Sequence, residues 1–421
     1  MPPGTDRPTI PPPATPSGRR LRSTAALGLG GLASGLSRAL GRGNGNQIRG
    51  RVALAVDPEL PRTLARGRRV VLVSATNGKT ATASMLAAAL RADDLAVTTN
   101  ADGANLLAGM TSALAADPTA PVAVLECDEA NLPFALELMS PELVVLGNLS
   151  RDQLDRHLEV RRLAERWKDV LARFPTKVIA SNSDPNVAWA VEDVEDVTWV
   201  DTGLVSRLDN AICPSCRELL DLSADTWTCA CGFSRPAAAV SLEGDELRLD
   251  GRRVPLELRL TWSWQRANAA LALAAADALG LDAAEAAVAV GRLESVGNRR
   301  SRVDVGDGRS AELVLAKNPS SWSLLIDELE GSSHALVIAQ DDNAADGTDP
   351  SWLWDVPFER LQGLTIATAG SRSLDVAVRL AHAGCRPVAV EDDPRVAARA
   401  LPGDDLVVAA SYTIFHGMAL R

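Results

Sequence analysis

The 421-residue sequence predicts an α/β protein of the doubly wound class, with two domains and a small cysteine-rich insertion in the first. Short apolar runs alternate with Ala- and Leu-rich stretches of helical length, which is typical of parallel sheets connected by helices. A Gly78-Lys79-Thr80 turn lies a few residues after one apolar run, and four of the six cysteines lie within residues 213–231. The sequence therefore indicates a phosphate-binding α/β fold with an insertion held together through its cysteines.

The first domain is predicted to span about residues 46–300 and to follow an N-terminal tail. Residues 1 to about 22 are rich in Pro, Thr, Ser and Arg, so we expect them to be disordered. Leucines between Leu27 and Leu40 then indicate a short apolar helix within residues 1–45. In the domain itself we expect strands at 69–74, 121–126, 143–148 and 177–181, helices at 80–91, 160–173 and 267–279, and short hairpin strands within 240–260.

A second, Rossmann-like domain is predicted for residues 301–421. A fresh series of apolar runs begins after Gly297, which places the boundary near residue 300. We expect its strands near residues 312–316, 335–339, 364–368, 387–390 and 406–409.

Composition and charge limit the class of partner and the compartment. A hydrophobic content of 46% supports full cores, and a net charge of −11 argues against nucleic acid as the main partner. Arg19-Arg20 followed by an apolar stretch resembles an export leader, but that stretch is Gly-rich and is interrupted by Ser37 and Arg38. We expect a cytoplasmic protein, whose apolar helix either packs on the body or contacts the inner face of the plasma membrane.

Residues 73–80, Val-Ser-Ala-Thr-Asn-Gly-Lys-Thr, indicate a nucleotide-phosphate site at a helix N-terminus. Backbone N–H groups there bind phosphate, Lys79 adds a positive charge near the β- and γ-phosphates, and Thr80 offers its hydroxyl to Mg²⁺. The match to a standard loop is incomplete because Val73 stands in place of the first glycine. The alternative is a strand, turn and helix that contain Gly-Lys-Thr by chance.

The four clustered cysteines have the spacing of a metal site. Cys213 and Cys216 form a C-x₂-C pair, and after twelve residues Cys229 and Cys231 form a C-x-C pair. Four thiolates close a tetrahedral Zn²⁺ shell without an open position, so we expect structural zinc rather than catalytic zinc. Loosely packed core thiols are the alternative, because the second pair is one residue tighter than usual. Cys127 and Cys385 are expected to be buried small hydrophobes.

Polar residues follow several of the predicted strands, at the edge where open α/β sheets bind ligands. Glu126 ends a Val-rich strand and could hold Mg²⁺, the alternative being a solvated acidic loop. Asn148 ends the next strand and leads into a run with His157, which taken alone is more often a helix-start residue than a ligand.

Together with Asn182-Ser183-Asp184 and Asn268 in an Ala-rich helix, these residues resemble the central domain of the Mur ligases, a family similar to folylpolyglutamate synthase. The resemblance implies that ATP phosphorylates a carboxylate and that an amine then attacks the acyl phosphate. It implies ATP binding by Thr76, Asn77, Gly78, Lys79, Thr80, Glu126 and Asn268, with Mg²⁺ on Thr80 and Glu126.

The sequence also departs from that family. Gln153 stands where many members have a metal-binding histidine, and Lys168 lies where members often carry a carbamylated lysine, a modification left open for this chain. Only about 45 residues precede the ATP-binding domain, so we expect no UDP-binding domain.

The tetracysteine insertion and the Trp-Leu-Trp run within residues 346–355 resemble one branch of the family, the ligase-like subunits of lipid II isoglutaminyl synthase. Further matching pieces are Lys317-Asn318-Pro319, residues 370–375 and Arg379. That branch implies amidation of the D-glutamate α-carboxyl of the peptidoglycan stem peptide to D-isoglutamine. It also implies a heterodimer with a GatD-type glutaminase, which supplies ammonia from glutamine.

The resemblance further implies that an aspartate within residues 346–355 completes the Cys-His pair of the glutaminase, with Asp355 as first choice and Asp349 as second. From the residues alone, both would more simply cap a turn or a helix. Two rival functions remain at this point. One is a ligase that adds a whole amino acid without a glutaminase, and the other is a non-catalytic ATP-binding scaffold.

Overall fold

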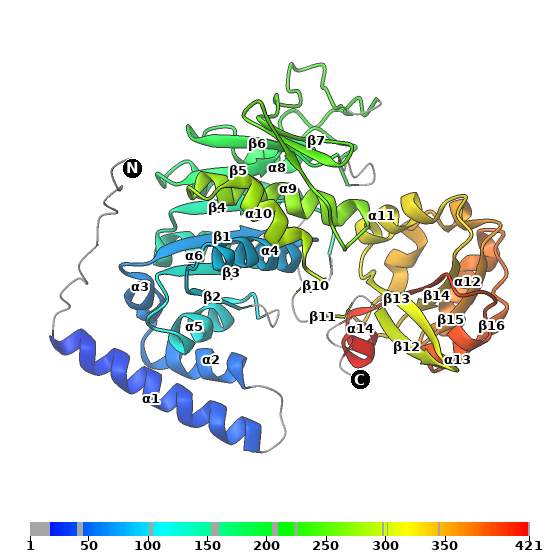
Figure 1. Cartoon of the computed structure of the whole chain (residues 1–421), viewed down its shortest axis with the longest axis horizontal. Helices are drawn as coiled ribbons and strands as arrows, with labels where there is room; N and C mark the ends of the chain where they lie inside the picture. Colours follow the sequence, from blue (N-terminus) through cyan, green and yellow to red (C-terminus); the bar gives the residue numbers. More distant parts are fainter. Residues whose placement is uncertain are drawn as a thin grey trace, which may run out of the picture.

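The structure is a computed structural model that describes residues 17–39, 45–100, 104–152, 160–203, 209–223, 226–296, 299–300, 302–343 and 346–419. These residues form two α/β bodies, each built on one sheet (Figure 1). The predicted fold class is confirmed.

The first sheet has nine strands in the order β2-β3-β1-β4-β5-β6-β7-β8-β9. Pairing is parallel from β2 to β7 and antiparallel from β7 to β9. The strands are β1 (Arg69–Ser74), β2 (Val97–Thr99), β3 (Val122–Glu126), β4 (Leu143–Leu146), β5 (Lys177–Ser181), β6 (Val197–Asp201), β7 (Val240–Glu243), β8 (Glu246–Leu249) and β9 (Arg252–Pro255).

Helices cover both faces of this sheet because its central strands are apolar on both sides. Val71 and Val73 pack in one core with α4 (Lys79–Ala92), α9 (Ser263–Ala278) and α10 (Ala283–Gly291). Val70 and Leu72 pack in the other core with residues of α5 (Leu107–Ala116), α6 (Leu132–Met139), α7 (Val160–Leu171) and α8 (Pro185–Ala190).

The N-terminal region is more ordered than predicted. Helix α1 begins at Ser17 and ends at Ala39, so the expectation of disorder is wrong for residues 17–22, whereas residues 1–16 lie outside the described residues. It packs on α2 (Asn46–Val56), which packs on α5, and α3 (Leu60–Ala65) leads into β1. Small residues permit this packing, since a Cβ atom on Gly30 would lie 2.7 Å from the Arg49 carbonyl oxygen. No helix among the described residues is both long enough and apolar enough to cross a membrane.

The second sheet has six strands in the order β12-β13-β17-β14-β15-β16, parallel except for the β12-β13 hairpin. A small ladder of β10 (Ser295–Val296) and β11 (Arg299–Arg300) precedes it. The second domain consists of β12 (Arg302–Gly306), β13 (Arg309–Leu315), α11 (Pro319–Leu329), β14 (Ala335–Ala339), η1 (Pro350–Asp355), η2 (Phe358–Leu361), β15 (Thr365–Ala369), α12 (Ser373–His382), β16 (Ala389–Val390), α13 (Pro394–Arg399), β17 (Leu406–Ala410) and α14 (Tyr412–Ala419).

Candidate active site at the domain interface

The phosphate loop joins β1 to α4 and is held by residues of neighbouring elements. Gly78 has a φ of 89°, the left-handed region that favours glycine. A Cβ atom at this position would lie 2.2 Å from Oδ1 of Asn268. Asn148 brackets the loop: its Oδ1 accepts from the Asn77 N–H at 3.0 Å, and its Nδ2 donates to the Asn77 carbonyl at 2.8 Å. The protein itself therefore fixes the loop at the N-terminus of α4.

Lys79 begins α4 and forms a buried ion pair with Glu129. Nζ of Lys79 lies 2.9 Å from Oε2 of Glu129, and the two side chains are only 8% and 10% exposed. Burial works to lower the pKa of Lys79, but the charges of Glu129 and Glu126 outweigh it and raise that pKa. Burial works to raise the pKa of Glu129, and the charges of Lys79 and Lys317 hold it below its usual value. Both groups are therefore ionised at neutral pH.

Glu126 ends β3 directly beside Thr80. Its Oε2 accepts from Thr80 Oγ1 at 2.7 Å, and its Oε1 accepts from Asn105 Nδ2 at 3.3 Å. Asn100 fixes the backbone of Glu126 by accepting from its N–H and donating to its carbonyl. Glu126 is 3% exposed, so the alternative of a solvated acidic loop is wrong for this residue. A buried carboxylate beside a threonine hydroxyl fits the oxygen ligands that Mg²⁺ takes.

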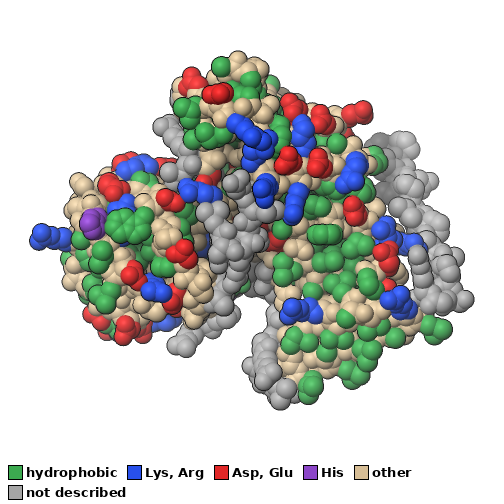
Figure 2. Space-filling model, turned by 180° about the vertical axis from the view of Figure 1, so that it is seen from behind, with side chains coloured by type: hydrophobic (Ala, Val, Ile, Leu, Met, Phe, Trp, Pro, Cys, Tyr) green, Lys and Arg blue, Asp and Glu red, His purple; other side chains and the backbone are tan. Residues whose placement is uncertain are grey.

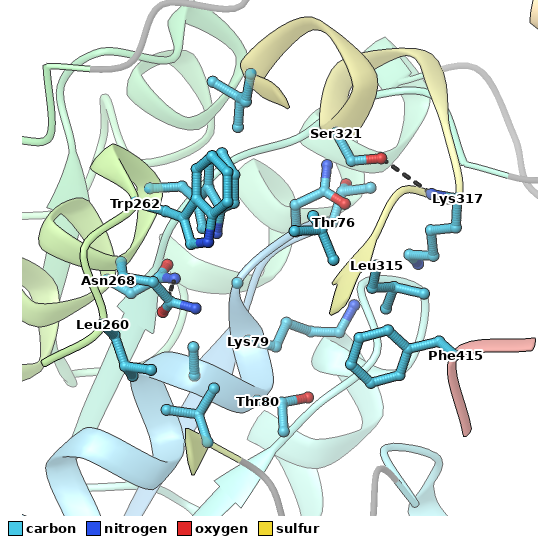
Figure 3. Close-up of a pocket in the computed structure, with 18 of the residues that line it drawn as sticks. Thr76, Lys79, Thr80, Leu260, Trp262, Asn268, Leu315, Lys317, Ser321 and Phe415 are labelled. Atoms are coloured by element: carbon cyan, nitrogen blue, oxygen red, sulfur yellow. Dashed lines mark hydrogen bonds between the residues drawn. The ribbon is translucent and has the colours of Figure 1, made fainter. Parts of the chain in front are cut away.

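A cavity of about 250 Å³ extends from the loop into the space between the two domains. Figure 3 shows Trp262 and Asn268 on one side of it, Lys79 and Thr80 in the middle, and Lys317 and Phe415 on the opposite side. Trp262 and Trp264 stack with ring centroids 4.8 Å apart, and Leu260 adds an apolar side chain on the same side of the cavity. An apolar end suits a planar base, and a loop with backbone N–H groups suits phosphates.

Three polar contacts join the domains beside this cavity. Asn77 and Asn318 exchange side-chain hydrogen bonds of 3.4 and 3.2 Å. Lys317 pairs with Asp152, which places a second ammonium group near the loop. Asn318 also caps α11 by accepting from the Ser321 N–H at 2.9 Å, which fixes the turn after β13. The second domain thus contributes a cation of its own to the site.

The two candidate aspartates for the partner's active site lie on η1. Asp349 accepts from the Ser351 N–H at 2.9 Å as the N-cap, and these hydrogen bonds lower the pKa of its carboxyl. Asp355 ends η1, and its Oδ2 accepts from Arg151 at 2.9 Å. The guanidinium of Arg151 also contacts Asp209 at 2.5 Å. The capping alternative therefore describes Asp349, whereas Asp355 is half-exposed and oriented by an arginine of the other domain.

The four clustered cysteines converge in a small ribbon between β6 and β7. All four Sγ atoms lie within 4.8 Å of one another, with 3.9 Å between Cys213 and Cys231 and 3.4 Å between Cys216 and Cys229. A zinc tetrahedron with bonds of about 2.3 Å has edges of roughly 3.8 Å, so this donor set fits the ion. Trp227 anchors the ribbon by donating to the Asn182 carbonyl at 3.0 Å.

The remaining predicted residues lie away from this chemistry or outside the described residues. Cys127 and Cys385 are buried as predicted, and burial raises the pKa of each thiol. Lys168 lies on α7 and pairs with Glu192 at 2.6 Å and Asp193 at 2.9 Å. Burial works to lower its pKa, but these partners raise it overall. Gln153 and His157 lie outside the described residues.

Several residues of the site were not predicted. Glu129 and Arg151 belong to the polar runs at strand ends but were assigned no role, because their partners lie in distant parts of the chain. Asn105 and Asp209 stand in no recognisable motif and contact the site only through the fold. The Trp262-Ser263-Trp264 run just before an Ala-rich helix was a readable signal, because two tryptophans at a helix start form a flat apolar surface.

The fold and the phosphate loop define a protein of the Mur ligase class. The model for the Mur ligase middle domain matches residues 73–210, and the model for the MurT ligase C-terminal domain matches residues 315–415. Together these two matches span more than half of the chain. The chain belongs to the MurT branch of the Mur ligase family.

Curated relatives agree with this assignment. The MurT subunit of lipid II isoglutaminyl synthase (glutamine-hydrolyzing) from Staphylococcus aureus (strain COL) is 29% identical over 403 residues, which cover 89% of this chain and 91% of that protein. The subunit of the same name from Streptococcus pneumoniae (strain ATCC BAA-255 / R6) is 28% identical and covers 81% and 83%.

Solved structures show the same fold at lower identity. A pseudomurein peptide ligase type C from Methanothermus fervidus has a TM-score of 0.66 at 16% identity and covers 83% of this chain and 77% of that chain. MurF ligase from Thermotoga maritima, in complex with ADP, has a TM-score of 0.60 at 14% identity and covers 87% and 82%. Mycobacterium tuberculosis folylpolyglutamate synthase complexed with ADP has a TM-score of 0.56 at 17% identity and covers 86% and 94%.

Proposed function

We propose that this chain is the ligase subunit of a lipid II isoglutaminyl synthase and amidates the α-carboxyl of D-glutamate in the peptidoglycan stem peptide. The observation that carries the proposal is the phosphate loop with Lys79, Thr80 and Glu126, in a chain that matches MurT subunits over about nine-tenths of its length. The chain's own geometry supports each step of an acyl-phosphate reaction.

The first step transfers the γ-phosphoryl group of ATP to the carboxylate. We assign the adenine to the part of the cavity lined by Trp262 and Asn268, and the triphosphate to the loop. Lys79 then exchanges Glu129 for phosphate oxygens, and Thr80 with Glu126 would hold Mg²⁺, which neutralises charge on the phosphates when bound. Lys317 faces the same space from the second domain and orients either the γ-phosphate or the acceptor carboxylate.

The second step is attack of ammonia on the acyl phosphate, which releases phosphate and forms the amide. Ammonia reacts only in its unprotonated form, so a source docked to the ligase delivers it better than bulk solvent. We assign that source to a GatD-type glutaminase in a heterodimer. Both isolated cysteines, Cys127 and Cys385, are buried and have raised thiol pKa values, so neither suits the role of a glutaminase nucleophile.

The surface around Asp355 suits such a partner. Trp354, Leu374 and Val378 are 55%, 72% and 54% exposed on η1 and α12. The guanidinium carbon of Arg379 lies 5.5 Å from the centre of the Trp354 ring and orients it. Exposed apolar residues next to a carboxylate offer both docking area and a group for the partner's histidine. Asp355 uses Oδ2 for Arg151 and can offer Oδ1, so it remains first choice, with Asp349 second.

The test is reconstitution of the full chain with candidate GatD-type glutaminases and lipid II. We expect ATP- and glutamine-dependent conversion of one carboxyl to an amide by mass spectrometry. At alkaline pH, ammonium chloride should replace both glutamine and the partner. A product heavier by an amino acid residue would support the amino-acid ligase instead. If lipid II does not stimulate ATP consumption, the chain is a non-catalytic ATP-binding scaffold instead.

A further inference from the structure

Helix α1 turns its apolar side chains away from the protein. With 3.6 residues per turn, Leu21, Leu29, Leu32 and Leu36 fall within an arc of roughly 80° on one face. Their exposed fractions are 76%, 49%, 73% and 64%. Figure 2 shows hydrophobic side chains gathered over this part of the molecule. A surface helix ordinarily turns its apolar stripe toward the core, so the arrangement here is inverted.

The opposite face of α1 is small and polar, and it fixes the helix in this orientation. Ser23, Ala26, Gly30 and Ser34 are buried against α2 and its neighbours. The Ser23 hydroxyl donates to Asp57 at 2.7 Å. Gly30 leaves so little space that a Cβ atom would lie 2.7 Å from a backbone oxygen of α2. Rotating the helix to bury its leucines would lose this close packing.

The charge of this region is opposite to that of the whole chain. Residues 17–56 hold seven arginines and no Asp, Glu or Lys, whereas the chain has a net charge of −11. Arg22 and Arg51 are exposed on α1 and α2, and Ile48 adds an apolar side chain that is 37% exposed. A strongly positive segment with an exposed apolar face fits a negatively charged apolar surface.

We propose that α1 binds in the plane of an anionic lipid bilayer, with its leucines among the upper acyl chains and the exposed Arg22 and Arg51 against lipid phosphates. A second copy of the chain fits the face less well, because two such segments would bring like charges together. The proposal is independent of the ligase reaction, since the binding needs neither ATP nor a stem peptide.

The test is co-flotation of the full chain with vesicles of phosphatidylglycerol and phosphatidylcholine in equal parts, compared with phosphatidylcholine alone. The test variant carries Leu32→Gln and Leu36→Gln. The matched control carries Phe134→Gln and Val288→Gln, which remove two exposed apolar side chains elsewhere. Thermal unfolding and light scattering establish that all three proteins are folded and report their mass.

Binding to the anionic vesicles should weaken in high salt and fall roughly tenfold or more in the test variant, while the control binds like the natural chain. Three results would overturn the proposal. The first is failure of the natural chain to float with anionic vesicles, and the second is unchanged binding after the two leucine replacements. The third is a natural chain that is a dimer and that these replacements convert to a monomer.

Discussion

The side chains of Lys79 and Glu129 show how single residues set the state of the site. An ammonium and a carboxylate at 2.9 Å, both buried, hold each other ionised in a place where either alone would lose its charge. Lys79 is therefore charged and poised at the phosphate loop before any phosphate binds.

Replacing Lys79 by Met should lower the free energy of unfolding by about 3 kcal/mol, because it leaves Glu129 buried without its partner. Adding Glu129→Gln should recover most of that loss, since the double variant has no uncompensated charge. Urea unfolding measures both values. A double variant no more stable than Lys79→Met would contradict the pairing. ATP hydrolysis should be lost in both variants.

Replacing Gly78 by Ala should abolish nucleotide binding, because the new Cβ clashes with Asn268 and displaces the loop. The matched control is Gly331→Ala, where φ is 72° and a Cβ atom meets nothing within 4 Å. Both variants carry about 1–2 kcal/mol of backbone strain, and only the first should fail to bind ATP in calorimetry. Equal nucleotide affinity in the two variants would mean that the contact with Asn268 is unimportant.

At the scale of elements, the sequence predicted most of the helices and strands whose positions depend on local residue pattern. The strands at 69–74 and 177–181 and the helix that follows Gly78 were predicted within a residue or two, because apolar periodicity and turn chemistry are local. The ordered start of α1 at Ser17 was missed, since its order comes from Gly and Ser packing on α2. Composition alone reads the same residues as disordered.

The cysteine ribbon is an element whose order should depend on metal. We expect about one equivalent of zinc per natural chain. Cys213→Ser should remove this zinc and expose Trp227. Elemental analysis and tryptophan fluorescence measure the two effects. Cys385→Ser is the control and should retain the zinc, because Cys385 is buried in the second domain. Absence of zinc from the natural chain would contradict this prediction.

At the scale of the whole molecule, polar contacts between the domains assemble a site that neither domain contains alone. Lys317 meets Asp152, Asn318 meets Asn77, and Asp355 meets Arg151, each pair joining residues more than 160 positions apart. Lys317 and Asp355 were recognisable from the sequence, yet their partners depend on how the domains pack. Long-range pairing therefore limited the prediction of the site more than recognition of its residues did.

Asp355→Asn should separate the two activities of the proposed heterodimer. Glutamine hydrolysis should fall by roughly 10³- to 10⁴-fold, the cost of losing the acid of a triad, because the amide orients the partner's histidine wrongly. Amidation supported by ammonium chloride should stay within a few-fold of the natural chain. Asp349→Asn is the matched control and should leave both rates nearly unchanged. The reverse pattern would assign the role to Asp349.

The proposed reaction passes through an acyl phosphate on the stem-peptide carboxyl, which isotope transfer detects. Lipid II carrying ¹⁸O in the D-glutamate α-carboxyl should yield one labelled oxygen in inorganic phosphate for each amide formed, as measured by mass spectrometry of the released phosphate. Unlabelled phosphate alongside amide product, or label appearing in AMP, would rule out an acyl phosphate intermediate.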